Sequence, residues 1–109
     1  MAREIYQEIL RLEVMLQENN IPCEKGEVLN GWQICYPCFA LIKRVCSVIE
    51  HDGSYGREED RLEIMGLLTA EEEKYDLVAG HLTAEDVFSR IKNDYEGVKL
   101  LEKLKEETK

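Results

Sequence analysis

The residues with the most specific chemistry in this sequence are its four cysteines. Cys35 and Cys38 form a Cys-x-x-Cys pair, and Cys23 and Cys46 flank it. Thiolates at this spacing can ligate zinc, but structural zinc sites usually carry two such pairs, whereas here the outer cysteines stand alone. Neither histidine lies at a ligand spacing from them. We interpret the cysteines as buried thiols, with a zinc-stabilised module that uses all four as an alternative, and we predict no cofactor.

A second reactive group is the segment 51–55, which reads His-Asp-Gly-Ser-Tyr. It holds a base, an acid and hydroxyl groups, the set that nucleophilic hydrolysis needs. These groups must converge in space, which neighbours in sequence seldom do. A polar turn explains the same residues, since glycine supplies a positive φ and aspartate bonds its own backbone. A small hydrolase around His51 is therefore a second alternative.

Acidic side chains dominate the charge of the chain. Its 109 residues include 23 acids and 14 bases, a formal net charge of −9. Binding of nucleic acid or of an anionic membrane surface depends on basic side chains, so we expect neither. Residues 57–76 hold eight acids and three bases, a net charge of −5. We predict that this segment binds a basic protein surface, although an ordinary solvated surface would have the same composition. The predicted contact residues are Glu58, Glu59, Asp60, Glu71, Glu72 and Glu73.

An apolar stripe lies near the C-terminus, where Val98, Leu101 and Leu104 recur at helical spacing among charged residues. It extends beyond what a three-stranded sheet can cover. It either packs on the N-terminal helix or mediates self-association, and both alternatives stay open. Leu101 and Leu104 complete the predicted partner-binding residues, and a homodimer through this helix is one expected assembly.

The compartment follows from what the sequence lacks. No run of about 18 apolar residues is present, so no membrane span is predicted. The first residues, Met-Ala-Arg-Glu-Ile, lack the apolar core of a signal peptide. We therefore expect a cytoplasmic protein with reduced cysteines.

The elements that must position these side chains follow from hydrophobic spacing. From Ile5 to Leu16 the apolar residues recur with a helical period, which predicts a helix over about residues 3–19. The period changes to two around Trp32, Ile34 and Tyr36, as in a half-buried strand. The predicted strands are residues 32–36, 44–51 and 61–68. Short connections between them favour an antiparallel sheet.

A register in which paired residue numbers sum to 81 collects aromatic and β-branched side chains on one face. The predicted pairs are Trp32 with Ile49, Tyr36 with Val45 and Cys35 with Cys46. Asn30-Gly31 is a competing signal, since this dipeptide favours a tight turn that would pair residues 24–29 with the segment from Trp32 onward. It ranks second because residues 23–27 have a poor strand composition.

Two helix starts follow the strands. Thr69 and Thr83 each precede an acidic residue three positions later, which is typical of a helix N-cap. A helix is therefore expected to begin at Ala84, and Gly97 either breaks it or is tolerated inside it.

The predicted fold is α+β, with a three-stranded antiparallel sheet and N-terminal and C-terminal helices packed on one face. One domain spans residues 1–109 and consists of an N-terminal helix (1–22), strands (30–68) and a helical C-terminal part (69–109). The predicted core is Trp32, Ile34, Tyr36, Val45, Ile49, Leu62, Ile64, Val87, Phe88 and Ile91.

Four segments, residues 31–37, 45–56, 62–67 and 82–88, resemble a pattern found in small uncharacterised proteins of Gram-positive anaerobes, often within phage-like or conjugative elements. The resemblance covers about residues 30–95 and brings no known activity or catalytic residues. It implies a role in mobile-element biology, which admits inhibition of a host defence nuclease. Together with the charge, it leads us to expect a non-enzymatic acidic module that regulates by binding a basic protein.

Overall fold

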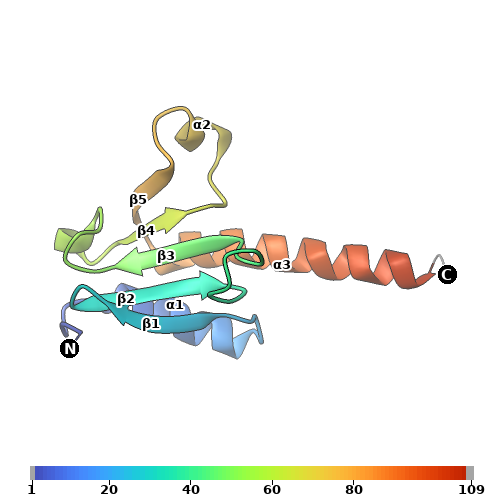
Figure 1. Cartoon of the computed structure of the whole chain (residues 1–109), viewed down its shortest axis with the longest axis horizontal. Coiled ribbons are helices and arrows are strands. Elements are labelled where there is room, and N and C mark those ends of the chain that lie inside the picture. The colour runs from blue at the N-terminus through green and yellow to red at the C-terminus, as the bar shows by residue number, and fades with distance from the viewer. Residues whose placement is uncertain (1, 108–109) are drawn as a thin grey trace.

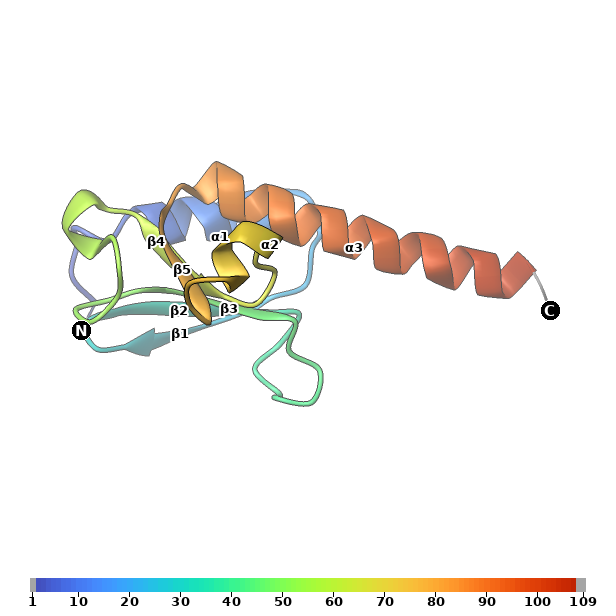
Figure 2. The same cartoon turned by 90° about the horizontal axis from the view of Figure 1, so that it is seen from above.

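A five-stranded antiparallel sheet forms the centre of the protein, whose residues 2–107 are described by a computed structural model. The strands follow chain order and are β1 (Glu24–Val28), β2 (Gly31–Tyr36), β3 (Cys46–Glu50), β4 (Leu62–Met65) and β5 (Val78–Leu82). The helices are α1 (Glu8–Glu18), the short 3-10 helix η1 (Arg57–Glu59), α2 (Ala70–Glu73) and α3 (Ala84–Glu107). Figures 1 and 2 show α1 and α3 side by side on one face of the sheet. The predicted α+β class, antiparallel sheet and terminal helices are confirmed, but the prediction of three strands is wrong.

Strand β1 is one of the two strands that were not expected. It pairs with β2 through a two-residue turn of Leu29 and Asn30, which both have a positive φ, and Gly31 is already the first residue of β2. The competing hairpin is therefore confirmed, with its turn one residue earlier than the Asn30-Gly31 dipeptide indicates. The charged composition of β1 is tolerated because it forms an edge of the sheet, where Glu24 and Glu27 reach solvent.

Strand β5 is the second strand that the sequence did not predict. It lies inside residues 69–109, which were predicted to be helical, and it pairs with β4 across a register irregularity between Leu62 and Ile64. Gly80 weakens its strand signal, but a side chain would not fit there: a Cβ on Gly80 would lie 2.4 Å from Cβ of Tyr55.

The register between β2 and β3 differs from the prediction by one residue. Paired residue numbers sum to 82, so Trp32 lies opposite Glu50, Tyr36 opposite Cys46 and Cys35 opposite Ser47. The predicted pairs Trp32–Ile49, Tyr36–Val45 and Cys35–Cys46 are therefore wrong.

A shift of one residue exchanges the two faces of a strand. Cys46, Val48 and Glu50 of β3 are buried beneath the helices, whereas Ile49 lies on the other face and Val45, just before the strand, is exposed. Hydrophobic pattern alone favours burial of Ile49 over Glu50. The buried glutamate is accepted because distant segments supply polar partners for it, as described below.

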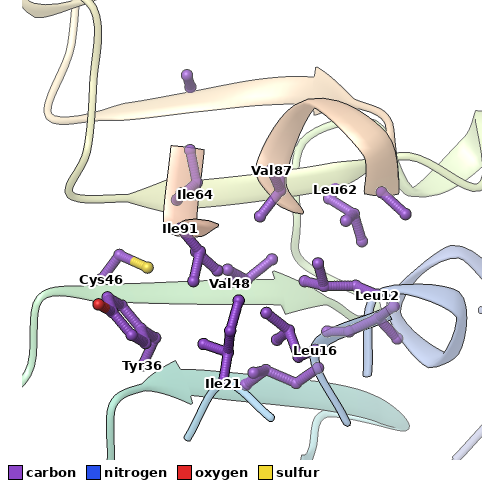
Figure 3. Packing of buried hydrophobic residues seen from close by; sticks show 14 residues of the cluster. Leu12, Leu16, Ile21, Tyr36, Cys46, Val48, Leu62, Ile64, Val87 and Ile91 are labelled. Atoms are coloured by element: carbon purple, nitrogen blue, oxygen red, sulfur yellow. The ribbon is translucent and has the colours of Figure 1, made fainter. Parts of the chain in front are cut away.

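The core lies between the sheet and the two long helices (Figure 3). Of the predicted core, Ile34, Tyr36, Leu62, Ile64, Val87 and Ile91 are buried, and Trp32 and Phe88 pack against this cluster half-buried. Helix α1 contributes Ile9, Leu12 and Leu16, all fully buried. Only Val45 and Ile49 are misplaced, both as a result of the register error.

The two long helices have well-defined first turns. Helix α1 begins at Glu8, later than the predicted residue 3. At α3 the expected cap is present, because Thr83 Oγ1 accepts a hydrogen bond from the Asp86 N–H at 3.2 Å. Helix α3 continues through Gly97 to Glu107, so the glycine does not break it.

Candidate functional site

The four cysteines do not gather at one point. Cys35 and Cys46 belong to opposite faces of the sheet, and Cys23 and Cys38 are half-buried elsewhere. Within residues 2–107 no three His, Cys, Asp or Glu side chains are placed to hold a metal ion, so the zinc alternative gains no support. Burial raises the pKa of Cys46 to about 12, and it also raises the pKa values of Cys35 and Cys23. These cysteines are protonated thiols at neutral pH.

The segment 51–55 forms a hydrogen-bonded turn. His51 is buried, and its ring Nδ1 accepts a hydrogen bond from the Gly53 N–H at 2.9 Å. The Ser54 hydroxyl bonds the backbone N–H and carbonyl of His51 instead of its ring. The Asp52 carboxylate accepts hydrogen bonds from the hydroxyl of Tyr6 and from the side-chain amide of Asn30. Acid, base and hydroxyl therefore do not form a relay, and the hydrolase alternative gains no support from this geometry.

Three carboxyl groups, two of them buried (Glu8 and Glu50) and one half-buried (Asp60), occupy the N-termini of the two long helices. Asp60 Oδ1 accepts the backbone N–H groups of Gln7 at 2.9 Å and of Glu8 at 3.0 Å, and Glu50 Oε1 accepts that of Ile9 at 3.2 Å. Glu8 in turn accepts the N–H of Ala84 at 2.7 Å, at the start of α3. Carboxylates are favourable at these positions because the first N–H groups of a helix lack partners within it. Asp60, predicted to contact a partner, is thus part of the fold.

The protonation of this group follows from its surroundings. Burial, together with a hydrogen bond to Asp60, raises the pKa of Glu50 to about 9. Among the described residues Glu50 Oε2 has no hydrogen-bond partner, so no donor at that oxygen offsets the cost of burying its charge. Burial would also raise the pKa of Asp60, but hydrogen bonds from Glu50 and from two backbone N–H groups outweigh it and lower that pKa. At neutral pH the pair therefore carries one proton, on Glu50.

The acidic segment 57–76 does not form one surface. Glu58 and Glu59 in η1 precede β4, whereas Glu71 and Glu73 in α2 follow it, and the two groups lie apart in Figure 1. All four are exposed. Glu72 is only half-exposed, and its carboxylate accepts hydrogen bonds from both terminal nitrogens of Arg90, at 2.7 and 2.8 Å. Four of the six predicted acidic contact residues are therefore available to a partner, while Glu72 and Asp60 hold structure together.

The segment 69–77, which we call the α2 lobe, combines exposed acids with exposed apolar side chains. It stands away from the sheet in Figure 1. Tyr75 and Leu77 are 79% and 80% exposed, next to Glu71, Glu73 and Asp76. Sequence reasoning missed both apolar residues, because a single tyrosine and leucine among acids produce no helical or strand period.

The α2 lobe is held in place by specific bonds. Thr69 and Glu72 form a reciprocal capping box, with bonds of 3.1 and 2.9 Å between each backbone N–H and the other side chain. Arg90 of α3 donates hydrogen bonds to the Glu72 carboxylate and to the carbonyl oxygen of Leu67, the latter at 3.2 Å. The lobe is therefore bonded to α3 although none of residues 69–77 is buried.

Glu72→Gln is expected to destabilise the protein by about 1–2 kcal/mol at pH 7, because it leaves the half-buried Arg90 with a neutral partner. The Arg90 guanidinium lowers the pKa of Glu72 to about 2. A carboxyl group whose pKa is lower in the folded than in the unfolded protein stabilises the fold at pH values above its unfolded pKa. For Glu72 this contribution is lost as the pH falls from about 4.5 to about 2. Urea unfolding at pH 7 and pH 3 measures the effect, with the exposed Glu73→Gln as control. A deficit of equal size at both pH values would contradict this role.

Two hollows on the surface formed by residues 2–107 bear on the predicted sites. One, of about 350 Å³, is formed along α1 by Gln7, Leu10, Arg11, Val14 and Met15. The other, of about 410 Å³, lies between the end of the sheet and α3, and we call it the α3 groove. It is lined by Pro22, Tyr36, Pro37, Val45, Asp94, Tyr95, Val98, Lys99 and Glu102. His51 lines neither hollow.

The predicted C-terminal contact residues lie beyond this groove. Leu101 and Leu104 are 60% and 47% exposed on a part of α3 that projects past the sheet (Figure 2). They do not pack on α1, which leaves self-association as the alternative to be considered.

No protein-family model matches the chain, and comparisons with curated proteins and with solved structures found no match. Among residues 2–107 no helix has the length and apolar character that crossing a bilayer requires.

Proposed function

We propose that this protein is a non-enzymatic interaction module that regulates a basic partner protein by binding it through the α2 lobe. The observation that carries the proposal is the exposure of Tyr75 and Leu77 beside outward-facing acids on a segment that is itself fixed. Glu58 and Glu59 lie apart from this surface and are secondary contacts.

The composition of the α2 lobe suits a basic surface with an apolar pocket. The segment carries four acids and one base, and the body of the protein is also strongly acidic. Complementary charge accelerates encounter and selects the partner, whereas a buried aromatic side chain commonly supplies much of the affinity. We assign the first role to Glu71, Glu73 and Asp76 and the second to Tyr75, with Leu77.

The rigidity of the α2 lobe supports the same proposal. A surface that is already ordered loses little conformational entropy when it binds. The pairing of Glu72 with Arg90 and the capping box supply that order without occupying the outward-facing acids.

The test is capture of proteins from extracts of the source organism by the immobilised full chain. Glu71→Lys with Glu73→Lys, and separately Tyr75→Ser with Leu77→Ser, are each expected to weaken capture of the specific partner by about tenfold or more. Glu4→Lys with Glu18→Lys is the matched control, because it makes the same change in net charge at exposed residues of the N-terminal region. Equal capture by all variants, or equal loss in the control, would show that the α2 lobe is not the binding surface.

The setting of this function is part of the proposal. Free cysteines at positions 23, 35, 38 and 46 suit a reducing compartment, and we propose the cytoplasm. The resemblance to mobile-element proteins suggests that the partner belongs to the host or to the element.

A further inference from the structure

The C-terminal half of α3 is a helix without support from the rest of the chain. Every residue from Glu96 to Glu107 is exposed, and Figures 1 and 2 show this part beyond the end of the sheet. A helix of this length is marginal in water on its own. Val98, Leu100, Leu101 and Leu104 nevertheless place bulky apolar side chains along it, 44–60% exposed. Burial of this stripe would stabilise both the side chains and the helix.

The spacing of the stripe fits a second helix. Ile91, Asp94, Val98, Leu101 and Lys105 follow each other at alternating intervals of three and four residues, which is the spacing of a coiled-coil seam. Ile91 is buried in the body of its own chain, and the half-buried Asp94 accepts a hydrogen bond from the Tyr36 hydroxyl through Oδ2 at 2.8 Å, so the solvent-facing part of the seam begins at Asp94 and extends to Lys105. This seam has an acid at one end, a base at the other and apolar residues between.

The order of these residues makes the seam complementary to itself in one direction. In an antiparallel pair, Asp94 of one helix meets Lys105 of the other, and Val98 meets Leu101. In a parallel pair, Asp94 would meet Asp94 and Lys105 would meet Lys105, and like charges at a seam oppose association. A twofold antiparallel arrangement repeats each favourable contact twice.

The charge distribution also favours a second, antiparallel copy of this chain as the partner. The first 96 residues carry 20 acids and 10 bases, so the bodies of two copies repel each other. Residues 97–107 carry three lysines and three glutamates, and their net charge is zero. Antiparallel pairing joins the neutral segments and leaves the acidic bodies at opposite ends of an overlap of about 18 Å.

The α3 groove continues the seam. Asp94, Tyr95 and Val98 line it, together with apolar residues from the end of the sheet. In an antiparallel pair the equivalent flanks of the two helices face each other, so the groove flank, with Tyr95, meets Glu102 of the second copy, and Leu104 lies on the opposite flank of the seam. We infer that a second copy of this chain docks antiparallel along α3, with Val98 of each copy against Leu101 of the other and Asp94 against Lys105.

Sedimentation equilibrium of the full chain, up to about 100 µM, tests this inference. The wild type is expected to form dimers, and Leu101→Glu to remain monomeric. Lys105→Glu is expected to weaken the dimer by about tenfold or more, because it sets two acids at each end of the seam. Lys103→Glu makes the same charge change on the opposite side of the helix and is expected to leave the dimer unchanged.

Far-UV circular dichroism establishes that each variant is folded. A monomeric wild type at all concentrations, or equal effects of Lys103→Glu and Lys105→Glu, would overturn the inference. The α2 lobe variants lie outside the seam and are expected to dimerise normally, so failure of this inference is distinct from failure of the proposed function.

Discussion

Gly31→Ala is expected to destabilise the protein by about 3–5 kcal/mol. Gly31 is the first residue of β2 and is buried against the end of β3. A Cβ there would lie 2.1 Å from the Glu50 carbonyl oxygen and 2.6 Å from the Cα of His51. Both atoms belong to backbone, so neither can move aside without separating β2 from β3. Urea or guanidinium unfolding at pH 7 measures the loss.

Gly97→Ala is the matched control, since it adds the same methyl group to the same residue type. Gly97 lies within α3, and a Cβ there meets no atom within 4 Å. Alanine is expected to stabilise the protein by about 0.5–1 kcal/mol, because it reduces the backbone entropy of the unfolded chain. A similar response of the two variants would contradict the packing described for Gly31.

Glu50→Gln is expected to stabilise the protein by on the order of 2 kcal/mol at pH 8, equivalent to roughly 10 °C in Tm. The amide reproduces the protonated carboxyl group: its oxygen accepts the Ile9 N–H, and its NH2 group donates to Asp60. In the wild type the folded pKa of Glu50, about 9, exceeds the unfolded value near 4.5. The folded state therefore binds more protons between these values, and its stability falls as the pH rises from about 4.5 to about 9.

The advantage of Glu50→Gln over the wild type should therefore grow with pH and be small near pH 5. Thermal unfolding at intervals between pH 5 and pH 9 measures the difference. Glu59→Gln, at an exposed carboxylate of η1, is the control and is expected to show no such trend. Parallel stability curves for Glu50→Gln and the wild type would show that Glu50 is ionised in the folded protein.

The features predicted correctly from the sequence depend on residues close together in the chain. The caps at Thr69 and Thr83 each join residues three positions apart, and the periods around Leu12 and Ile34 arise within single elements. Local chemistry is enough to determine such features.

The incorrect predictions concern features that depend on contacts between residues far apart in the chain. The β2–β3 register depends on the burial of Glu50, which is acceptable only because Ile9 and Asp60 supply its partners. Their contribution exceeds the preference for burying Ile49, and no local pattern reports it. Asp60 and Glu72 were assigned to a binding surface for the same reason, since composition does not separate a carboxylate that caps a helix or pairs with Arg90 from one that faces solvent.

The carboxylates at the start of α1 also determine when that helix can be completed as the chain is made. Its first three bonded N–H groups find their acceptors 41 to 53 residues later in the chain. On the ribosome, α1 emerges well before Asp60 emerges, so its first turn has only water as a partner during that interval. The helix acquires its final position only once β3 and the η1 turn have followed, and folding of the N-terminal region must therefore wait for translation of the middle of the chain.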